Sequence, residues 1–247
     1  MKNFAMLLVN NNRSKAYLQT LIKNNYAPLK VVILEDDSIK LPEHTDSDSI
    51  FTNNSTQTLI KECQNTHITF DEKENVVSTL KKNNIPFESI NKLDINSDEV
   101  ITALSKIESE YIIYSGPGGS ILREKILGLN KNFIHVHPGS LPYFRGSTTI
   151  YYSMFIKNMV SASVIFLTKN IDEGPVLHTC DFEIKDPYID FDYLFDPCVR
   201  AATLLQFFEN NYSKKIDITE QPILSKANTY YIIHPVLKHL SILKTRK

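Results

Sequence analysis

The stretch Phe133-Ile-His-Val-His-Pro-Gly-Ser-Leu-Pro-Tyr-Phe-Arg-Gly-Ser147 decides how this chain folds. It begins with the aromatic and β-branched residues typical of a buried strand and then turns through Pro138, Gly139 and Pro142. Ligands gather at the carboxyl ends of strands in an open α/β sheet, so a strand ending in histidines indicates a functional site. A second turn, Asn170-Ile-Asp-Glu-Gly-Pro-Val-Leu177, supplies a carboxylate about thirty residues later. If the two turns meet, they provide a His/Asp pair for proton transfer.

Strand and helix patterns alternate along the chain. The expected strands cover residues 4–9, 30–35, 86–90, 111–114, 132–137, 162–168 and 176–184. The expected helices cover residues 14–24, 71–83, 97–105, 121–127, 147–158 and 190–209. Pro197 must start, kink or interrupt the last of these. This order predicts an α/β fold: a mainly parallel, twisted, Rossmann-like sheet with helices on both faces.

Two segments give weaker patterns. Residues 36–70 are rich in Asp, Ser, Thr and Asn, and we expect them to be mostly irregular. Residues 210–247 carry a Gln221-Pro222 turn and an apolar run at residues 230–233, for which an added β-hairpin is the expected structure. We therefore predict a catalytic domain over residues 1–209 and a short C-terminal extension over residues 210–247, packed on the same domain.

Composition excludes several classes of protein. The 247 residues are 42% hydrophobic and 22% charged, with a formal net charge of −1 and no Lys/Arg block, so no nucleic-acid partner is expected. The apolar run at residues 4–9 is too brief to span a membrane and has no small-residue cleavage site after it, so no membrane partner is expected. Cys63, Cys180 and Cys198 form no Cys-x-x-Cys pair, so neither a disulfide framework nor a zinc ribbon is indicated. These features predict a cytoplasmic protein.

His135 and His137 lie on the same face of the expected strand, because residues i and i+2 of a strand point the same way. Three interpretations are open at this point. Either histidine is simply a hydrogen-bonded residue at a strand end. Alternatively, the pair chelates zinc, with Asp172 or His178 as a further ligand. In the third interpretation, one histidine moves a proton during attack on a carbonyl while the other positions or polarises the substrate.

The residues that follow the histidines resemble the signature of the formyltransferases that use 10-formyltetrahydrofolate. That signature is Asn-x-His-Pro-Ser-Leu-Leu-Pro, a Lys/Arg-Gly pair, and an Asp-x-Gly loop about thirty residues on. The matching positions are His135, His137 to Pro142, Arg145-Gly146 and Asp172 to Gly174. The family includes the methionyl-tRNA, glycinamide ribonucleotide and sugar N-formyltransferases. The chain departs from the signature in two places, since His135 replaces the Asn and Gly139-Ser140 replaces Ser-Leu.

The resemblance implies an enzyme in which a deprotonated amine attacks the formyl carbon of the folate cofactor. His137 is expected to assist proton transfer, and Asp172 to hold the imidazole or an ordered water and raise its basicity. In the family, the Asn amide donates a hydrogen bond to the formyl oxygen. An imidazole N–H can do the same if the tautomer is right or the ring is protonated, so His135 is expected to stabilise the oxyanion.

The resemblance also implies binding residues. The loop Ser115-Gly-Pro-Gly-Gly119 lacks the residues of a P-loop and the spacing of a dinucleotide fingerprint, and a structural turn is the alternative to a cofactor contact. The residues expected to bind the cofactor are Gly116, Gly118, Gly119, Ile121, Leu122 and Asp172. Tyr143 and Arg145 are expected to bind the acceptor, although a structural role for Arg145 is equally open.

The acceptor follows by elimination. The chain is too short for the C-terminal barrel of the tRNA-formylating members, and a first strand at Phe4 leaves no room for the regulatory domain of the formyltetrahydrofolate hydrolases. It is longer than the glycinamide ribonucleotide formyltransferases. The expected substrate is therefore a small-molecule amine, a nucleotide-linked amino sugar, and a homodimer is compatible with this architecture. The alternatives are a metal-dependent hydrolase built on the two histidines and a folate-binding member with altered chemistry.

Overall fold

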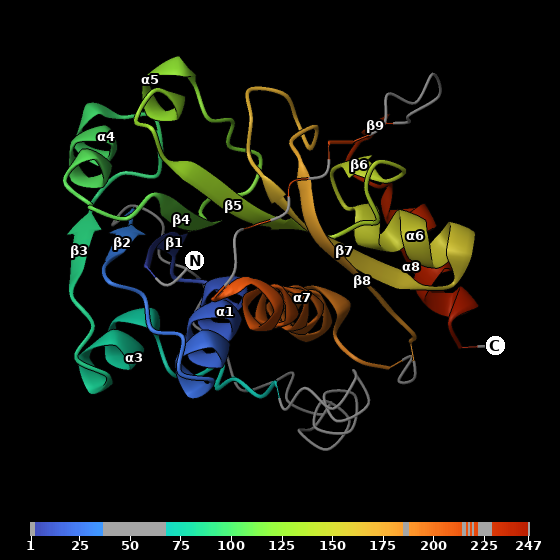
Figure 1. Ribbon diagram of the computed structural model, residues 1–247. Helices are drawn as coiled ribbons and strands as arrows, with labels where there is room; N and C mark the ends of the chain where they lie inside the picture. Colours follow the sequence, from blue (N-terminus) through green and yellow to red (C-terminus); the bar gives the residue numbers. More distant parts are fainter. Residues whose placement is uncertain are drawn as a thin grey trace.

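The computed structural model describes residues 3–36, 68–184, 188–213, 216, 218, 220–221 and 229–246 (Figure 1). The segment expected to be irregular, residues 36–70, lies mostly outside this part of the chain, as does Cys63. Among the described residues, no helix is both long enough and apolar enough to cross a bilayer.

In the described part of the chain, seven strands form one sheet in the order β3-β2-β1-β4-β5-β7-β8. Five of them run parallel: β1 (Phe4–Val9), β2 (Val31–Leu34), β3 (Phe87–Ile90), β4 (Tyr111–Ser115) and β5 (Asn132–His137). β7 (Val160–Phe166) runs antiparallel to β5, and β8 (Val176–Phe182) runs antiparallel to β7, so β7 alone opposes the direction of the other strands of this sheet. The mainly parallel α/β fold is thus confirmed. The connection from β7 to β8 carries no helix, and so short a turn can only join antiparallel strands.

Helices cover both faces of the sheet, as predicted (Figure 1). One face packs on α1 (Asn12–Lys23), α3 (Val76–Lys82) and α7 (Asp196–Asn211). The opposite face packs on α4 (Asp98–Ser105) and α5 (Glu124–Leu127). The side chains of β5 alternate between these two cores, since Ile134 and Val136 belong to the first and Phe133 to the second. His135 and His137 therefore point toward the α4 and α5 face.

Several helices begin later than the sequence predicts. The helix expected from residue 71 starts at Val76, because the side chain of Asn75 accepts the Ser78 N–H and caps it. The helix expected from residue 190 starts as a π-helical turn, η2 (Phe191–Phe195), and α7 follows. Pro197 lies in the first turn of α7, where its missing N–H leaves no hydrogen bond unmade.

The C-terminal segment differs from the expected β-hairpin. Its strand β9 (Thr229–Tyr230) pairs in parallel with β6 (Arg145–Gly146), and the chain then forms helix α8 (Pro235–Lys244). The hairpin prediction was wrong because His234 and Pro235 form a helix start: the imidazole accepts the Val236 N–H, and the proline supplies a helical φ. Helix α8 packs against α6 (Thr149–Lys157), which in turn packs on β7 (Figure 1). The division into residues 1–209 and 210–247 stays a prediction. Helix α7 itself crosses that boundary and ends at Asn211.

Candidate active site

The candidate site lies at the carboxyl ends of β4 and β5, close to the point where the strand order reverses between β1 and β4. The turn after β5 is fixed by Ser163 of the neighbouring strand β7. Its hydroxyl donates to the carbonyl of Gly139 at 2.7 Å and accepts the N–H of Leu141 at 3.2 Å. The loop between β7 and β8 starts beside the other end of β5, where Phe166 pairs with Ile134, and carries Asp172 to His137.

His137 and Asp172 meet in this site. The Nδ1 atom of His137 lies 3.3 Å from Oδ1 of Asp172, and both side chains are nearly buried, at 2% and 11% exposure. The structure therefore brings together the two residues on which the expected proton-transfer pair depends.

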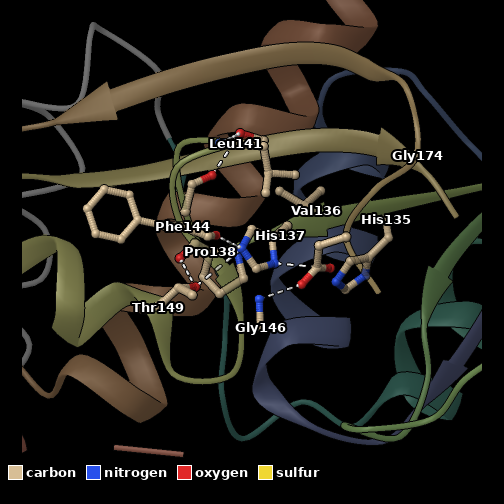
Figure 2. A network of polar contacts seen from close by, with 12 residues as sticks. His135, Val136, His137, Pro138, Leu141, Phe144, Gly146, Thr149 and Gly174 are labelled. Atoms are coloured by element: carbon tan, nitrogen blue, oxygen red, sulfur yellow. Dashed lines mark hydrogen bonds and ion pairs between the residues drawn. The ribbon is translucent and has the colours of Figure 1, made fainter. Parts of the chain in front are cut away.

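The second nitrogen of His137 also faces acceptors (Figure 2). Its Nε2 atom lies 2.6 Å from the carbonyl of Phe144 and 3.3 Å from the hydroxyl of Thr149, which donates its own proton to Pro138. Gly139 makes this approach possible, since a Cβ there would lie 2.8 Å from the Phe144 oxygen and 2.9 Å from Nε2. With acceptors on both nitrogens, the ring can donate on both sides only as an imidazolium. One ring nitrogen of His137 thus faces a carboxylate and the other a backbone carbonyl.

The Asp172 carboxylate is held on its other oxygen as well. Oδ2 accepts the backbone N–H of Gly146 at 2.9 Å, and the residue has a left-handed backbone with φ of 53°. Burial alone would raise the pKa of the Asp172 carboxyl, but the hydrogen bond and charge of His137 and the N–H of Gly146 outweigh it and lower the pKa. The group is a carboxylate at neutral pH.

His135 is half-buried beside β4. Its Nδ1 atom lies 3.5 Å from the carbonyl of Tyr114, whose ring centre is 5.9 Å from the imidazole. Burial and then the charges of Arg200 and Arg13 lower the pKa of His135 to about 3. The ring is therefore neutral at physiological pH. The protonated ring is thereby excluded as the donor to an oxyanion. His135 could donate only as a neutral ring whose single N–H faces that oxygen.

This neutral histidine predicts a pH-dependent stability. Between the ordinary value of 6.5 and the folded value of about 3, the unfolded chain binds a proton at His135 that the native protein does not. The contribution of His135 to the free energy of unfolding is therefore highest above pH 6.5 and falls as the pH drops toward the folded pKa. The expected decrease is about 2 kcal/mol between pH 7 and 5. We expect His135→Asn to lack this component, so that its urea midpoint falls less than that of the wild type over this range. Equal slopes for the two proteins would contradict a neutral, desolvated His135.

Two arginines that sequence reasoning missed lie behind the histidines. Arg200 of α7 donates to the carbonyl of Val136, between the two histidines, at 3.1 Å and to Asp196 at 2.8 Å. Arg13 of α1 donates to the hydroxyl of Ser115 at 3.0 Å and to the carbonyl of Gly116. The only sequence signal was the Asp196–Arg200 spacing of one helical turn, which does not indicate a functional site.

The residues expected to bind the cofactor divide into two groups. A Cβ at Gly118 or Gly119 would meet no atom within 4 Å, so this part of the loop faces open space, and the Ile121 side chain is 49% exposed. In contrast, Leu122 is 3% exposed and packs in the core, and a Cβ at Gly116 would strike the Tyr114 ring at 2.5 Å. Leu122 and Gly116 could therefore contact a ligand only through their backbone, and the carbonyl of Gly116 already accepts from Arg13.

The two residues expected to bind the acceptor have different environments. Tyr143 is 56% exposed, with the ammonium of Lys157 5.3 Å from its ring centre. Arg145 is 12% exposed and donates to Glu173 at 3.2 Å and to Gln221 at 3.0 Å. Arg145 therefore joins the Asp172 loop to the C-terminal segment, and its role toward a substrate stays a prediction.

His178, one of the alternative metal ligands, lies elsewhere. Its Nε2 atom is 3.1 Å from the sulfur of Cys180 and 3.4 Å from the amide oxygen of Gln206 on α7, on the opposite face of the sheet from His137. Within the described ranges, no group of three His, Cys, Asp or Glu side chains is arranged to hold a metal ion. No observation thus favours the hydrolase interpretation.

Comparisons with known proteins agree with this geometry. No protein-family model matches the sequence. Methionyl-tRNA formyltransferase of Finegoldia magna is 27% identical over 144 residues, which cover 57% of this chain and 46% of that protein. The match thus spans less than half of the relative's length.

Solved structures give a match over more of the chain. A sugar N-formyltransferase from Shewanella sp. FDAARGOS_354 superposes with a TM-score of 0.55 at 14% identity, covering 99% of this chain and 88% of the other. Phosphoribosylglycinamide formyltransferase from Bacillus halodurans gives 0.52 at 14% identity, with 86% and 100% covered. The N-formyltransferase from Helicobacter canadensis, in complex with folinic acid and dTDP-3-aminofucose, gives 0.51 at 13% identity, with 94% and 71% covered.

A mainly parallel sheet with a His/Asp pair at the carboxyl ends of its strands defines a Rossmann-like α/β protein. Within that class, the chain has the fold of the formyltransferase family.

Proposed function

We propose that this protein is an enzyme that transfers a formyl group from 10-formyltetrahydrofolate to the primary amine of a small molecule. The observation that carries the proposal is the contact between His137 and Asp172 at the carboxyl end of β5, beside the neutral His135. Such a set can move a proton and donate a hydrogen bond to a carbonyl oxygen within one buried site.

The residues present fit the cofactor. The open backbone at Gly118 and Gly119 and the exposed Ile121 offer polar groups and an apolar surface to a flat heteroaromatic ring. Tyr114 joins this loop to the catalytic residues, because its carbonyl and ring both contact His135 while its hydroxyl donates to Pro117. Bound 10-formyltetrahydrofolate would supply the activated formyl carbon.

The protein's own groups handle the proton and the developing charge. The acceptor nitrogen loses a proton as it bonds to the formyl carbon, and the donor nitrogen gains one as its bond to that carbon breaks. His137 delivers the proton that it shares with Asp172 and recovers one from the attacking amine. To donate to the formyl oxygen as negative charge develops there, neutral His135 must carry its single proton on Nε2 and give up donation from Nδ1 to the carbonyl of Tyr114, a contact of 3.5 Å.

A nucleotide-linked amino sugar is the acceptor that we propose. The sugar N-formyltransferase from Shewanella superposes over 99% of this chain. The Helicobacter protein was solved in complex with folinic acid and dTDP-3-aminofucose, and this supports an acceptor of the same class here. The chain's net charge of −1 gives no general attraction to the phosphates of a tRNA.

A direct test combines calorimetry with 5-formyltetrahydrofolate and a mass-spectrometric assay of 10-formyltetrahydrofolate with a panel of nucleotide-linked amino sugars. We expect folate binding and the gain of one CO unit by at least one amine. Folate binding without transfer to any amine would instead identify a folate-binding member with altered chemistry. Binding of neither ligand would overturn the proposal.

The cofactor loop can be tested separately through Gly118→Ala. The added methyl group meets no protein atom within 4 Å, so the melting temperature should stay unchanged. It projects into the space proposed for the cofactor, and the KM for 10-formyltetrahydrofolate should rise about tenfold, equivalent to roughly 1.4 kcal/mol of binding. An unchanged KM would remove this part of the loop from the cofactor site.

A further inference from the structure

We propose that Gln221, in the C-terminal segment, is a positioning residue that holds the Asp172 loop in its working conformation. The C-terminal segment is then part of the active site and not an appendage to it. The kinetic part of this inference rests on the proposed function, whereas the geometric part does not.

Gln221 uses both ends of its amide on this site. Its Nε2 atom donates to the carbonyl of Asp172 at 2.8 Å and to the carbonyl of Gly174 at 2.7 Å. Its Oε1 atom accepts from Nη2 of Arg145 at 3.0 Å. The orientation of the amide is fixed by chemistry, since carbonyls only accept and a guanidinium only donates.

The loop requires such support because its backbone is not relaxed. Asp172 has a left-handed backbone with φ of 53°, which costs a residue with a side chain on the order of 1 kcal/mol. This conformation aims Oδ1 at His137 and Oδ2 at Gly146. A backbone in a sparsely populated region persists only where its surroundings over-determine it. The two donations from Gln221 bracket the loop from Asp172 to Gly174.

The same segment supports the residues on the other side of Asp172. Strand β9 pairs with β6, and the N–H of Ser147 donates to the carbonyl of Tyr230 at 2.8 Å. This pairing places Gly146, whose N–H holds the Asp172 carboxylate. Arg145, next to it, bonds Glu173 as well as Gln221. The C-terminal segment thus holds Asp172 in two ways. Gln221 bonds its backbone carbonyl, and β9 places Gly146, which bonds its carboxylate.

Two variants separate the roles of the amide. Gln221→Leu keeps the approximate size and removes all three hydrogen bonds. Gln221→Glu keeps an acceptor for Arg145 but places carboxylate oxygens against the carbonyls of Asp172 and Gly174. Gln19 of α1 provides a matched control. Its amide donates to the carbonyl of Asp71 and accepts the N–H of the same residue, and so ties α1 to a loop remote from the site. Gln19→Leu removes an equivalent clamp away from the site.

The first readout is kinetic. We expect both Gln221 variants to lower kcat for formyl transfer by about tenfold or more, because small displacements of a catalytic group are costly, while the KM for the amine changes little. Gln19→Leu should keep the wild-type kcat. If Gln221→Glu or a folded Gln221→Leu has the wild-type kcat, the inference is overturned.

The second readout does not depend on activity. The proton between Nδ1 of His137 and Asp172 should give a protected downfield imidazole N–H signal in the NMR spectrum, assigned by its loss in His137→Asn. We expect this signal to broaden or vanish in Gln221→Glu and to persist in Gln19→Leu. Its persistence in Gln221→Glu would refute the positioning role. If the wild type formylates no amine, this measurement still decides the inference, and the two failures are distinguished.

Discussion

His137→Asn is expected to lower kcat for formyl transfer by about 10³-fold, the size of effect typical of general acid–base catalysis. In the mechanism that we propose, the pair of His137 and Asp172 holds the proton that the reaction moves, and an asparagine side chain cannot carry it. Asparagine can place its amide near the position of Nδ1 and donate to Asp172, so the buried carboxylate stays paired. The loss should therefore appear in kcat and not in the folded structure.

Asp172→Asn tests whether the pair acts as one unit. We expect a similar loss in this variant and no further loss in the double variant, because residues that act together on one proton have non-additive effects. The measurements are steady-state kinetics of all three proteins beside circular dichroism and thermal melts. His178→Asn is the matched control, since His178 is also a histidine of the sheet but bonds Gln206 on the other face. Near-normal turnover in His137→Asn, or losses that multiply in the double variant, would contradict the mechanism.

Gly174→Ala is expected to be strongly destabilising although it adds only one methyl group. A Cβ at this position would lie 1.8 Å from the carbonyl oxygen of Phe166, a contact with backbone that no side-chain rotation relieves. The loop must shift, and we expect a loss of about 3 kcal/mol in the free energy of unfolding, at the upper end for overpacking. Because Gly174 also accepts a hydrogen bond from Gln221, the shift should move Asp172 away from His137 and abolish transfer.

Urea unfolding and a thermal melt check the stability of Gly174→Ala, and the formyl-transfer assay checks its activity. Gly118→Ala is the control for the added methyl group, since that methyl group meets open space and should leave the stability as it is. A Gly174→Ala protein with the stability of the control would show that the loop between β7 and β8 can move without cost. That result would also weaken the case that Gln221 holds this loop under strain.

Local patterns were sufficient for most of the sheet. The runs at residues 4–9, 111–114 and 132–137 are β-branched and apolar, and each became a strand with nearly the expected ends. The caps at Asn75 and Ser97 are local hydrogen bonds, and such bonds act within one turn of the chain. Helix α8 was missed because the apolar run at residues 230–233 suggests a strand, and the helix start after it depends on His234 and Pro235.

Long-range contacts explain what sequence reasoning missed in the site. Arg200 reaches the carbonyl of Val136 from a helix on the other side of the sheet, and no spacing rule links the two positions. The sequence indicated only a turn at Gln221, whereas its amide is engaged by the Asp172 loop and by Arg145. Nε2 of His137 faces the backbone carbonyl of Phe144. Because every residue has a backbone carbonyl, the sequence could not indicate which of them would be the acceptor.

By itself, the sequence determined the order of strands and helices through α7, the placement of two histidines on one strand face and a loop that carries a carboxylate. These depend on periodicity and turn chemistry, which act over a few residues. Only the tertiary structure decided that both nitrogens of His137 face acceptors, that His135 is neutral between two arginines and that the C-terminal segment holds Asp172. Burial, charge and hydrogen-bond partners are set by segments far apart in the chain, and they exist only once the chain has folded.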